Sequence, residues 1–337
     1  MQHSGPNHSG PNHSGMLDPV ITELDAARAI VYRHMSSTPT YNWPLLSARA
    51  GCEVWVKHEN HTPVGAFKVR GGLVYLTGLK ATQPDLQGVI SATRGNHGQS
   101  LAFAAAKVGL QAVVVVPHGN NPEKNAAMRA LGAELIEHGD DFQEALEYTQ
   151  GLAAERGLFM IGPFDAPLMR GVATYALELF EQVAKFDAVY VPIGMGSGIC
   201  GMITVRDALG LDTEIIGVVT ENADAYALSF EAGEVVTTAT ADTVADGLAC
   251  RSPDARAVEI ITRGAARVVR VSEDEVLAAM GHFFTDTHNV AEGAAGAALA
   301  GLLQEKDRQA GKRVGVVLTG GNVDRATLQT VLSRIED

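Results

Sequence analysis

One lysine, Lys68, stands in a stretch of small, apolar and turn-forming residues, HTPVGAFKVRGG (61–72). Surface lysines usually have polar neighbours, whereas this one directly follows Gly-Ala-Phe. Partial burial disfavours the charged ammonium and lowers a lysine pKa below its ordinary value of about 10.4. A lysine deprotonated in this way can form a Schiff base with a carbonyl compound. Lys68 is therefore a candidate for covalent chemistry, and a purely structural lysine is the alternative.

A second candidate is the glycine-rich segment VPIGMGSGICG (191–201). Glycines at 194, 196 and 198 leave successive backbone N–H groups uncovered after a predicted strand, which makes a cradle for an anion. No Gly-Lys-Ser/Thr sequence follows, so the segment is not a nucleotide phosphate loop, and it matches the dinucleotide fingerprint only loosely. A tight turn between a strand and a helix is the structural alternative.

Two further segments place polar side chains beside glycines. In ATRGNHGQS (92–100), a threonine, an asparagine and a histidine surround glycines at a predicted helix start. Asn96 can donate to a hydroxyl or carboxylate there, whereas helix capping by Asn96 or Thr93, and a core position for His97, are the alternatives. In LTGGNVD (318–324), Thr319 offers a hydroxyl just after a strand, and capping of the turn is the alternative.

These segments lie at the ends of predicted strands in an alternating pattern of strands and helices. GVISA is followed by an alanine-rich helix, AVVVVPHG (112–119) is a buried strand, and Pro122 suits a first helical position. Continuous Val/Ile runs between helices are typical of parallel strands covered on both faces. We therefore predict an α/β protein with doubly wound open sheets, whose ligands bind beyond the carboxyl ends of the strands.

Charge and composition exclude several classes of partner. The net charge of −13 argues against nucleic acid and anionic membranes, which select for basic surfaces. No apolar run approaches the roughly 20 residues of a membrane helix. The three cysteines (52, 200 and 250) are far apart and suit a reducing compartment rather than disulfides or zinc. We expect a cytoplasmic protein that acts on a small molecule.

The first residues differ from the rest of the chain. Residues 1–15 repeat HSGPN and contain no apolar run, so they predict a disordered tail, and we expect the natural chain to begin at Met16. About 320 residues remain, enough for one large or two ordinary domains.

In this order and near this spacing, the segments resemble the fold-type II pyridoxal-phosphate (PLP) enzymes, and within them the serine/threonine dehydratase and serine racemase branch. The resemblance spans Thr38 to Asp324. Phe67-Lys68-Val69-Arg70-Gly71 resembles the segment whose lysine holds the cofactor as a Schiff base. The sequence GNHG, where cysteine synthases have GNTG, favours this branch.

The resemblance implies a tryptophan synthase β-like fold with the cofactor between two domains. The large PLP-binding domain would comprise 16–85 and 166–337, and the small mobile domain 86–165. Asn96 would contact the 3′-oxygen of the cofactor, and Thr319 would face its ring nitrogen. The implied cofactor-binding residues are Phe67, Lys68, Asn96, Gly194, Met195, Gly196, Ser197, Gly198, Gly247, Glu292 and Thr319. The implied substrate-binding residues are Thr93, Arg94, Gly95, Asn96 and His97.

The resemblance also implies a reaction. Lys68 would take the α-proton of an amino acid, and the cofactor would delocalise the resulting charge. A neutral hydroxyl at Thr319 leaves the ring nitrogen unprotonated, which favours prompt loss of a β-leaving group. We therefore expect a homodimeric ammonia-lyase that converts a β-hydroxy-L-amino acid to a 2-oxo acid and ammonia. Threonine and serine are the default substrates, and 3-hydroxyaspartate and 3-phenylserine remain open.

Several positions depart from the branch. Arg94 replaces the second serine of Ser-Ser-Gly-Asn-His, and because a guanidinium does not deprotonate, we expect little racemase activity. Arg94 would pair with a nearby Asp or Glu, or bind an acidic group on the substrate. Arg170 and Val172 would reshape the entrance. Val219 and Ala225 stand where the branch has cation ligands. Glu221 or Asp224 is the alternative ligand, but hard cations need several oxygen ligands, so we expect no metal site.

Three other functions remain as alternatives. The first is a racemase or β-replacement synthase of the same fold. The second is a non-catalytic homologue that binds PLP or an amino acid. The third is a nucleotide-binding α/β protein, against which the missing phosphate-binding lysine argues.

Overall fold

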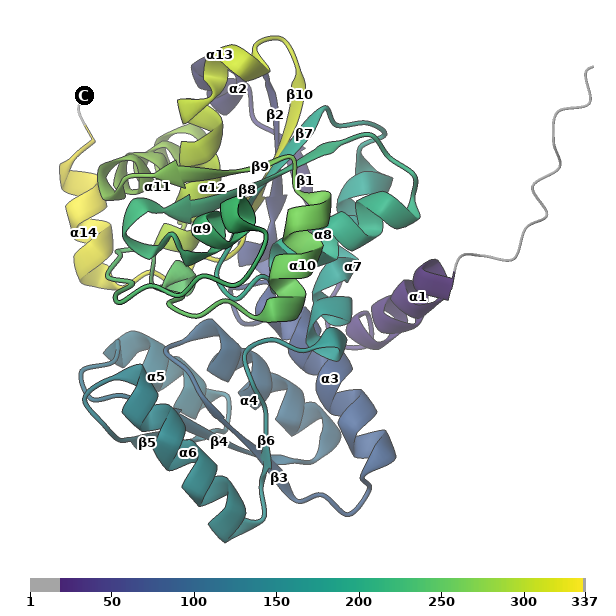
Figure 1. Ribbon diagram of the computed structural model, residues 1–337, viewed down its shortest axis with the longest axis vertical. Coiled ribbons are helices and arrows are strands. Elements are labelled where there is room, and N and C mark those ends of the chain that lie inside the picture. The colour runs from purple at the N-terminus through teal and green to yellow at the C-terminus, as the bar shows by residue number, and fades with distance from the viewer. Residues whose placement is uncertain (1–18, 336–337) are drawn as a thin grey trace, which may run out of the picture.

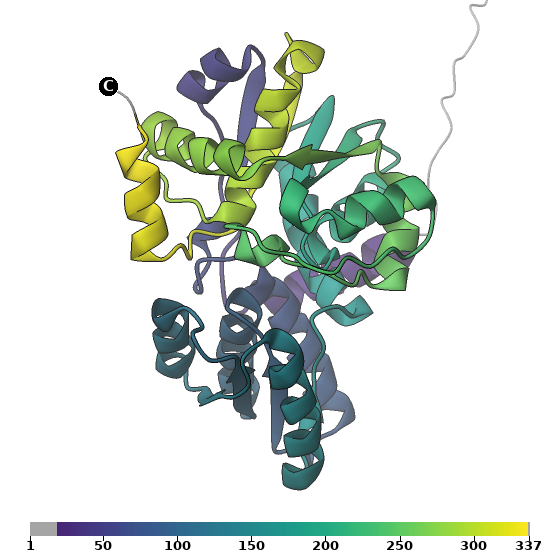
Figure 2. The ribbon, with the colours of Figure 1, turned by 60° about the vertical axis from the view of Figure 1, so that its left-hand side comes forward.

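The computed structural model describes residues 19–335, so the predicted tail of residues 1–15 lies outside the described residues. The chain folds into two halves, each built around one sheet (Figure 1). Figure 2 shows the same two halves from another side, with α14 on the flank of the larger one. The α/β class with open sheets, predicted from the alternation of apolar runs and helices, is confirmed.

The larger half contains a six-stranded sheet in the order β1-β2-β10-β7-β8-β9. Its strands are β1 (Thr40–Asn42), β2 (Glu53–His58), β7 (Ala188–Pro192), β8 (Glu214–Thr220), β9 (Arg267–Val271) and β10 (Arg313–Leu318). The short edge strand β1 is antiparallel to β2, and every other pair is parallel.

The smaller half contains a four-stranded parallel sheet in the order β5-β4-β3-β6. Its strands are β3 (Gly88–Ala92), β4 (Gln111–Val116), β5 (Glu134–Glu137) and β6 (Phe159–Met160). The helix after β4 begins at Pro122, as predicted, because proline lacks the N–H that a first helical turn leaves unpaired.

Helices cover both faces of the sheets (Figure 1). In the larger half they are α1 (Pro19–Val31), α2 (Pro44–Ala50), α7 (Ala166–Gln182), α8 (Ser197–Ala208), α9 (Ala225–Ala232), α10 (Ala255–Gly264), α11 (Glu273–Thr287), α12 (Gly293–Gln304), α13 (Lys306–Gln309) and α14 (Arg325–Ser333). The others are α3 (Lys68–Thr82), α4 (Asn96–Val108), α5 (Pro122–Ala130) and α6 (Phe142–Arg156). Short 3₁₀ turns are η1 (Glu59–His61), η2 (Glu221–Ala223) and η3 (Asp246–Leu248). Within residues 19–335, no helix has the length and apolarity to cross a membrane.

The central strand β7 shows why its run of apolar residues is continuous. Ala188 and Tyr190 belong to the core on one side of the sheet, beneath α11 and α12. Val189 and Val191 belong to the core on the other side, beneath α7 and α8. Successive strand residues point to opposite faces, so a strand covered on both sides favours apolar residues at every position.

Helix α3 joins the two halves. Its residues Val69, Leu73 and Leu76 share one core with Leu101 of α4 and Val114 of β4. By its side-chain packing α3 therefore belongs with the four-stranded sheet, although we predict a domain division at residue 86; that boundary stays a prediction. The first residue of α3 is Lys68, which lies at the junction of the two halves.

Candidate active site

Two hydrogen bonds hold the backbone at Lys68 in place. The N–H of Phe67 donates to the carbonyl oxygen of Thr319 at 3.0 Å, which ties the start of α3 to the end of β10. The hydroxyl of Ser100, on α4, donates to the carbonyl oxygen of Lys68 at 2.6 Å. Burial lowers the pKa of the Lys68 amine to about 8, against the opposing effect of Glu292. A substantial fraction of this amine is therefore neutral near pH 8, as a nucleophile or base requires.

The glycine-rich segment forms the turn between β7 and α8. A Cβ on Gly194 would lie 2.2 Å from the carbonyl oxygen of Gly247, so no larger residue fits there. Gly196 has a φ of 92°, in the left-handed region that favours glycine. No side chain caps the N-terminus of α8, so the first N–H groups of that helix are available to an anion.

Two buried tyrosines donate hydrogen bonds to carbonyl oxygens of this turn. The hydroxyl of Tyr175, on α7, donates to the carbonyl oxygen of Gly198 at 2.9 Å. The hydroxyl of Tyr226, on α9, donates to the carbonyl oxygen of Met195 at 3.0 Å. Tyr175 also packs edge-to-face against Phe67, with ring centroids 6.2 Å apart. The turn and the start of α3 are therefore positioned by the same tyrosine.

Asn96 and Glu292 form the polar centre of the site. The side-chain amide of Asn96 donates to both carboxylate oxygens of Glu292, at 2.8 and 3.0 Å. Asn322 in turn donates to the side-chain oxygen of Asn96 at 2.9 Å. Burial raises the pKa of Glu292 to about 7, and Lys124 opposes that rise. This carboxyl group therefore changes its charge near neutral pH.

The turn before α4 carries the predicted substrate residues. The N–H of Gly95 donates to the hydroxyl of Thr93 at 3.2 Å, and neither Thr93 nor Asn96 caps the helix through its side chain. The capping alternative for these two residues is therefore wrong. Burial, with a contribution from Lys68, lowers the pKa of His97 to about 3. His97 is thus neutral at physiological pH.

Thr319 lies at the end of β10, and its hydroxyl is buried without a hydrogen-bond partner among residues 19–335. A buried hydroxyl without a partner is costly unless a ligand supplies one. The site thus combines a lysine with a lowered pKa, an uncapped helix N-terminus and an unpaired hydroxyl. These residues fit a cofactor that offers an aldehyde, a phosphate and a ring nitrogen, which is the chemistry of PLP.

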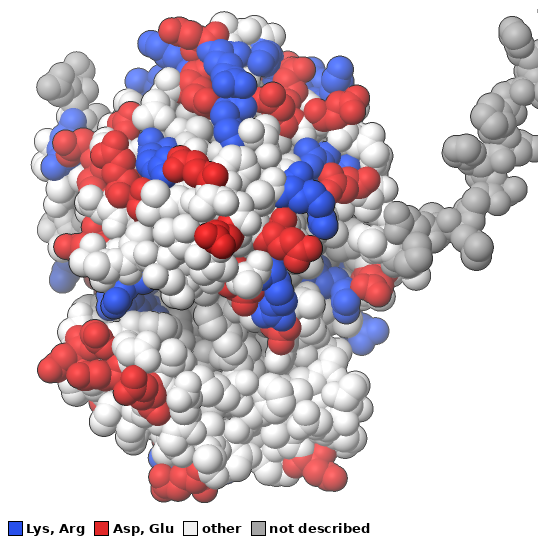
Figure 3. Space-filling model, viewed as in Figure 1, with Lys and Arg blue, Asp and Glu red and all other residues white. Residues whose placement is uncertain are grey.

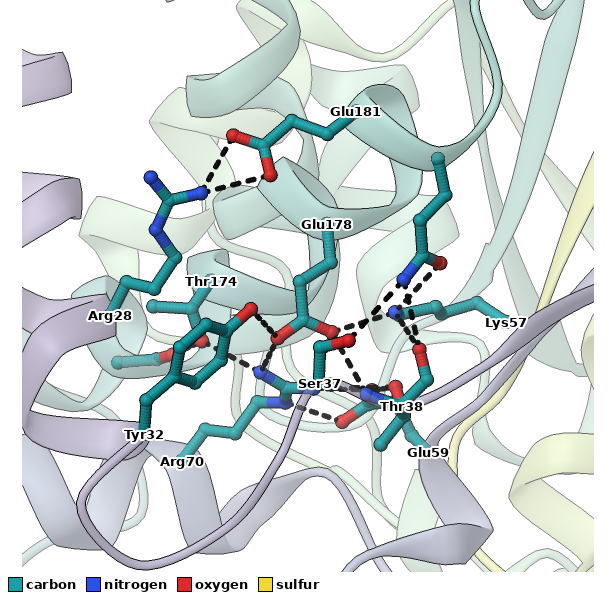
Figure 4. A network of polar contacts seen from close by, with 12 residues as sticks. Arg28, Tyr32, Ser37, Thr38, Lys57, Glu59, Arg70, Thr174, Glu178 and Glu181 are labelled. Atoms are coloured by element: carbon teal, nitrogen blue, oxygen red, sulfur yellow. Dashed lines mark hydrogen bonds and ion pairs between the residues drawn. The ribbon is translucent and has the colours of Figure 1, made fainter.

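A buried network of charges supports the start of α3 (Figure 4). The guanidinium of Arg70 contacts Glu59 at 2.7 Å and Glu178 at 2.7 Å, and Lys57 reaches the second oxygen of Glu178 at 2.7 Å. Burial alone would lower the pKa of Arg70, but Glu59 and Glu178 raise it above its ordinary value. The network joins β2, α3 and α7 two residues from Lys68.

A cavity of about 290 Å³ adjoins Glu292, at the boundary between the halves. It is lined by Arg94, Pro117, His118, Gly119, Asn120, Asn121, Lys124, Asp140, Val244, Asp246, Glu292, Gly293, Asn322, Val323, Asp324 and Thr327. Figure 3 shows a hollow between the two halves, with basic side chains at its left end.

The ammonium of Lys124, on α5, bonds to the carboxylate of Asp246, in η3, and so joins the two halves. Sequence reasoning missed both residues. The prediction of cofactor-binding residues included Gly247 but not its neighbour Asp246, and Lys124 looks like any polar residue of a surface helix.

The sequence matches the family model of pyridoxal-phosphate-dependent enzymes over residues 31–320, and the chain belongs to this family. Its cofactor is therefore pyridoxal phosphate. The chain is 33% identical over 316 residues to the L-threo-3-hydroxyaspartate ammonia-lyase of Saccharomyces cerevisiae, covering 93% of this chain and 96% of that enzyme. It is also 33% identical over 309 residues to the biosynthetic L-threonine dehydratase of Haemophilus influenzae.

The second match covers 91% of this chain, and the chain spans only 60% of the length of the H. influenzae dehydratase. Among solved structures, the fold is similar to the processed threonine deaminase isoform 2 of Solanum lycopersicum, with a TM-score of 0.87 and 29% identity. That similarity covers 95% of this chain and 94% of the tomato enzyme. The predicted fold type, family and cofactor are confirmed.

Proposed function

We propose that this enzyme is an ammonia-lyase that removes water from a β-hydroxy-L-amino acid and releases a 2-oxo acid and ammonia. The names of its relatives support this reaction, because the yeast enzyme is a 3-hydroxyaspartate ammonia-lyase and the H. influenzae enzyme a threonine dehydratase. The structural observation that carries the proposal is the placement of Lys68 at the start of α3, where Phe67 is hydrogen-bonded to Thr319 and the charge of Glu292 acts on the Lys68 amine.

We propose the following roles for the site residues. The turn from Gly194 to Gly198 holds the phosphate, supported by the uncapped N-terminus of α8. Thr319, whose buried hydroxyl has no partner among residues 19–335, faces the ring nitrogen. Asn96 contacts the ring hydroxyl and is oriented by Asn322. The turn of residues 93–97 binds the α-carboxylate of the substrate.

When bound, PLP withdraws electrons from the α-carbon and so makes its proton acidic. The Nζ atom of Lys68 takes that proton, because its lowered pKa leaves a substantial fraction of it neutral near pH 8. His97 is neutral and buried, so it contributes no positive charge to the site. Glu292, with its pKa near 7, is the nearby carboxyl group that can exchange a proton at the same pH.

A racemase is the second candidate of the same fold. Racemisation needs a group that returns a proton to the opposite face of the α-carbon. Arg94 occupies the position of the serine expected for that role, and its guanidinium stays protonated. We therefore propose that elimination dominates over racemisation.

The test is a product analysis of the holoenzyme with L-threonine, L-serine, L-threo-3-hydroxyaspartate and 3-phenylserine. The proposal predicts a 2-oxo acid and ammonia in equal amounts from at least one of them, and none from Lys68→Ala. A D-amino acid without 2-oxo acid, or a thioether when a thiol is added, would show one of the alternatives instead.

We also propose that the protein is a homodimer, as its resemblance to the family implies, and that it is cytoplasmic, as its three separate cysteines suggest. Light scattering coupled to gel filtration gives the molar mass directly. A mass near twice 35.5 kDa supports the dimer, and a mass near 35.5 kDa contradicts it.

A further inference from the structure

Arg94 is an unusual charge in the cavity that adjoins the site. Its side chain is exposed and lines the cavity, and in the described part of the chain it makes no ion pair or side-chain hydrogen bond. A guanidinium is always charged and presents a planar fork of donors that matches a carboxylate. Pairing with a neighbouring acidic residue, one of the two roles expected for Arg94, does not occur among residues 19–335.

Most acidic residues that line the same cavity already have partners. Asp246 is bonded to Lys124, Asp324 accepts from the N–H of Thr327 at 2.7 Å, and Glu292 accepts from Asn96. The exception is Asp140, which is exposed and forms no ion pair within the described residues. Arg94 is therefore the lining cation that remains free for a ligand.

A second cation borders the same turn. The stem of Lys124 packs directly on the residue after Arg94, because a Cβ on Gly95 would lie 2.7 Å from Lys124 Cδ. Lys124 is almost fully buried, and its charge acts on Glu292 across the cavity. Both cations therefore lie beside the turn of residues 93–97, to which the proposed function assigns the α-carboxylate of the substrate.

The cavity is poorly suited to an aromatic side chain. No phenylalanine, tyrosine or tryptophan is among its lining residues, and its apolar side chains are those of Pro117, Val244 and Val323. An aryl group placed there would cover polar groups without replacing their hydrogen bonds, which costs free energy. A small carboxylate can accept hydrogen bonds from these polar groups and from Arg94, so its binding leaves fewer of them without a partner.

We propose that Arg94 binds a second carboxylate, carried on the β-carbon of the substrate, so that acidic 3-hydroxy amino acids of the 3-hydroxyaspartate class are preferred. This inference rests on the proposed elimination reaction and names its substrate class. The yeast relative, which covers the same length, is an enzyme named for such a substrate.

The first test compares kcat/KM for L-threo-3-hydroxyaspartate and L-threonine in the holoenzyme. Arg94→Gln should lower the value for hydroxyaspartate on the order of 10- to 100-fold more than the value for threonine, because a charge-assisted bidentate contact is lost. Arg94→Lys, which keeps the charge without the fork, should fall between. Arg129→Gln removes an exposed arginine from α5, where it pairs with Glu137, and should leave the ratio unchanged.

The second test measures binding without turnover. L-Aspartate and L-asparagine have nearly the same size and carry no β-hydroxyl to eliminate, so calorimetric titration reports the charge preference alone. The wild-type holoenzyme should bind aspartate on the order of tenfold more tightly than asparagine, and Arg94→Gln should remove that difference.

The outcomes separate the two proposals. Equal losses for both substrates in Arg94→Gln would mean that Arg94 serves the α-carboxylate or the fold, and would overturn this inference, as would an unchanged ratio. If no substrate yields a 2-oxo acid, the proposed elimination fails instead. The aspartate and asparagine titrations then still decide whether Arg94 recognises a side-chain carboxylate.

Discussion

The guanidinium of Arg70 lies 2.7 Å from a carboxylate oxygen of Glu178, and neither side chain is exposed by more than 1% (Figure 4). This pair joins α3, which begins at Lys68, to α7. Glu178 also neutralises Lys57. The buried charges of Arg70 and Lys57 are therefore neutralised by Glu178 and Glu59. The position of α3 depends on all four charges.

Glu178→Gln should destabilise the protein by about 3–5 kcal/mol, since it leaves two buried cations, Arg70 and Lys57, with Glu59 as their one remaining acidic partner in the network. Glu181→Gln, in the same helix, removes an exposed partner of Arg28 and should cost less than about 1 kcal/mol. Urea unfolding followed by circular dichroism gives both values. Equal stability of the two variants would contradict a supporting role for the network.

Tyr175→Phe should weaken cofactor binding about tenfold, because the carbonyl oxygen of Gly198 loses its buried donor and the phosphate turn loosens. The measurement is a titration of the cofactor-free protein with PLP, followed by absorbance. Tyr190→Phe is the matched control, since its hydroxyl bonds to Glu305 on the far side of the sheet. If both variants bind PLP like the wild type, the tyrosine does not position the turn.

Glu292→Gln should change how stability depends on pH. The folded pKa of Glu292 is raised from 4.5 to about 7, so between these values the unfolded chain releases a proton that the folded chain keeps. The wild type therefore loses stability as pH rises from 4.5 to 7, on the order of 3 kcal/mol. In the Glu292→Gln variant this pH-dependent loss of stability is absent, because glutamine does not titrate.

The checking measurement is thermal unfolding of cofactor-free wild type and Glu292→Gln at pH 5 and pH 8. The melting temperature of the variant relative to the wild type should be higher at pH 8 than at pH 5. A difference that is the same at both pH values would show that the folded pKa of Glu292 is not raised.

Local sequence patterns predicted the strands, the helices and the glycine-rich turn. They did not predict the ion pairs, because these join residues far apart in the sequence. The strands around the glycine-rich turn and the helix at Pro122 follow from residues that are neighbours in sequence. The pair of Lys124 and Asp246 spans 122 positions, and that of Arg70 and Glu178 spans 108. No single sequence indicates which of many charged residues will meet across such distances.

The packing of α3 shows a further limit of local sequence patterns. The domain boundary at residue 86, which the family resemblance implies, assigns α3 to the large domain, and that boundary stays a prediction. The apolar face of α3 shares a core with α4 and β4, which include Leu101 and Val114. Hydrophobic periodicity shows that a helix has a buried face, but not which sheet will cover it.

The central claim is that Lys68 is the residue that binds the cofactor covalently. Its most direct test is reduction of the PLP-loaded protein with sodium borohydride, followed by proteolysis and mass spectrometry. We predict one pyridoxyl group per chain, on the peptide that contains Lys68, and none in Lys68→Ala. A label on another lysine, or an unlabelled wild-type protein, would contradict the account of this site.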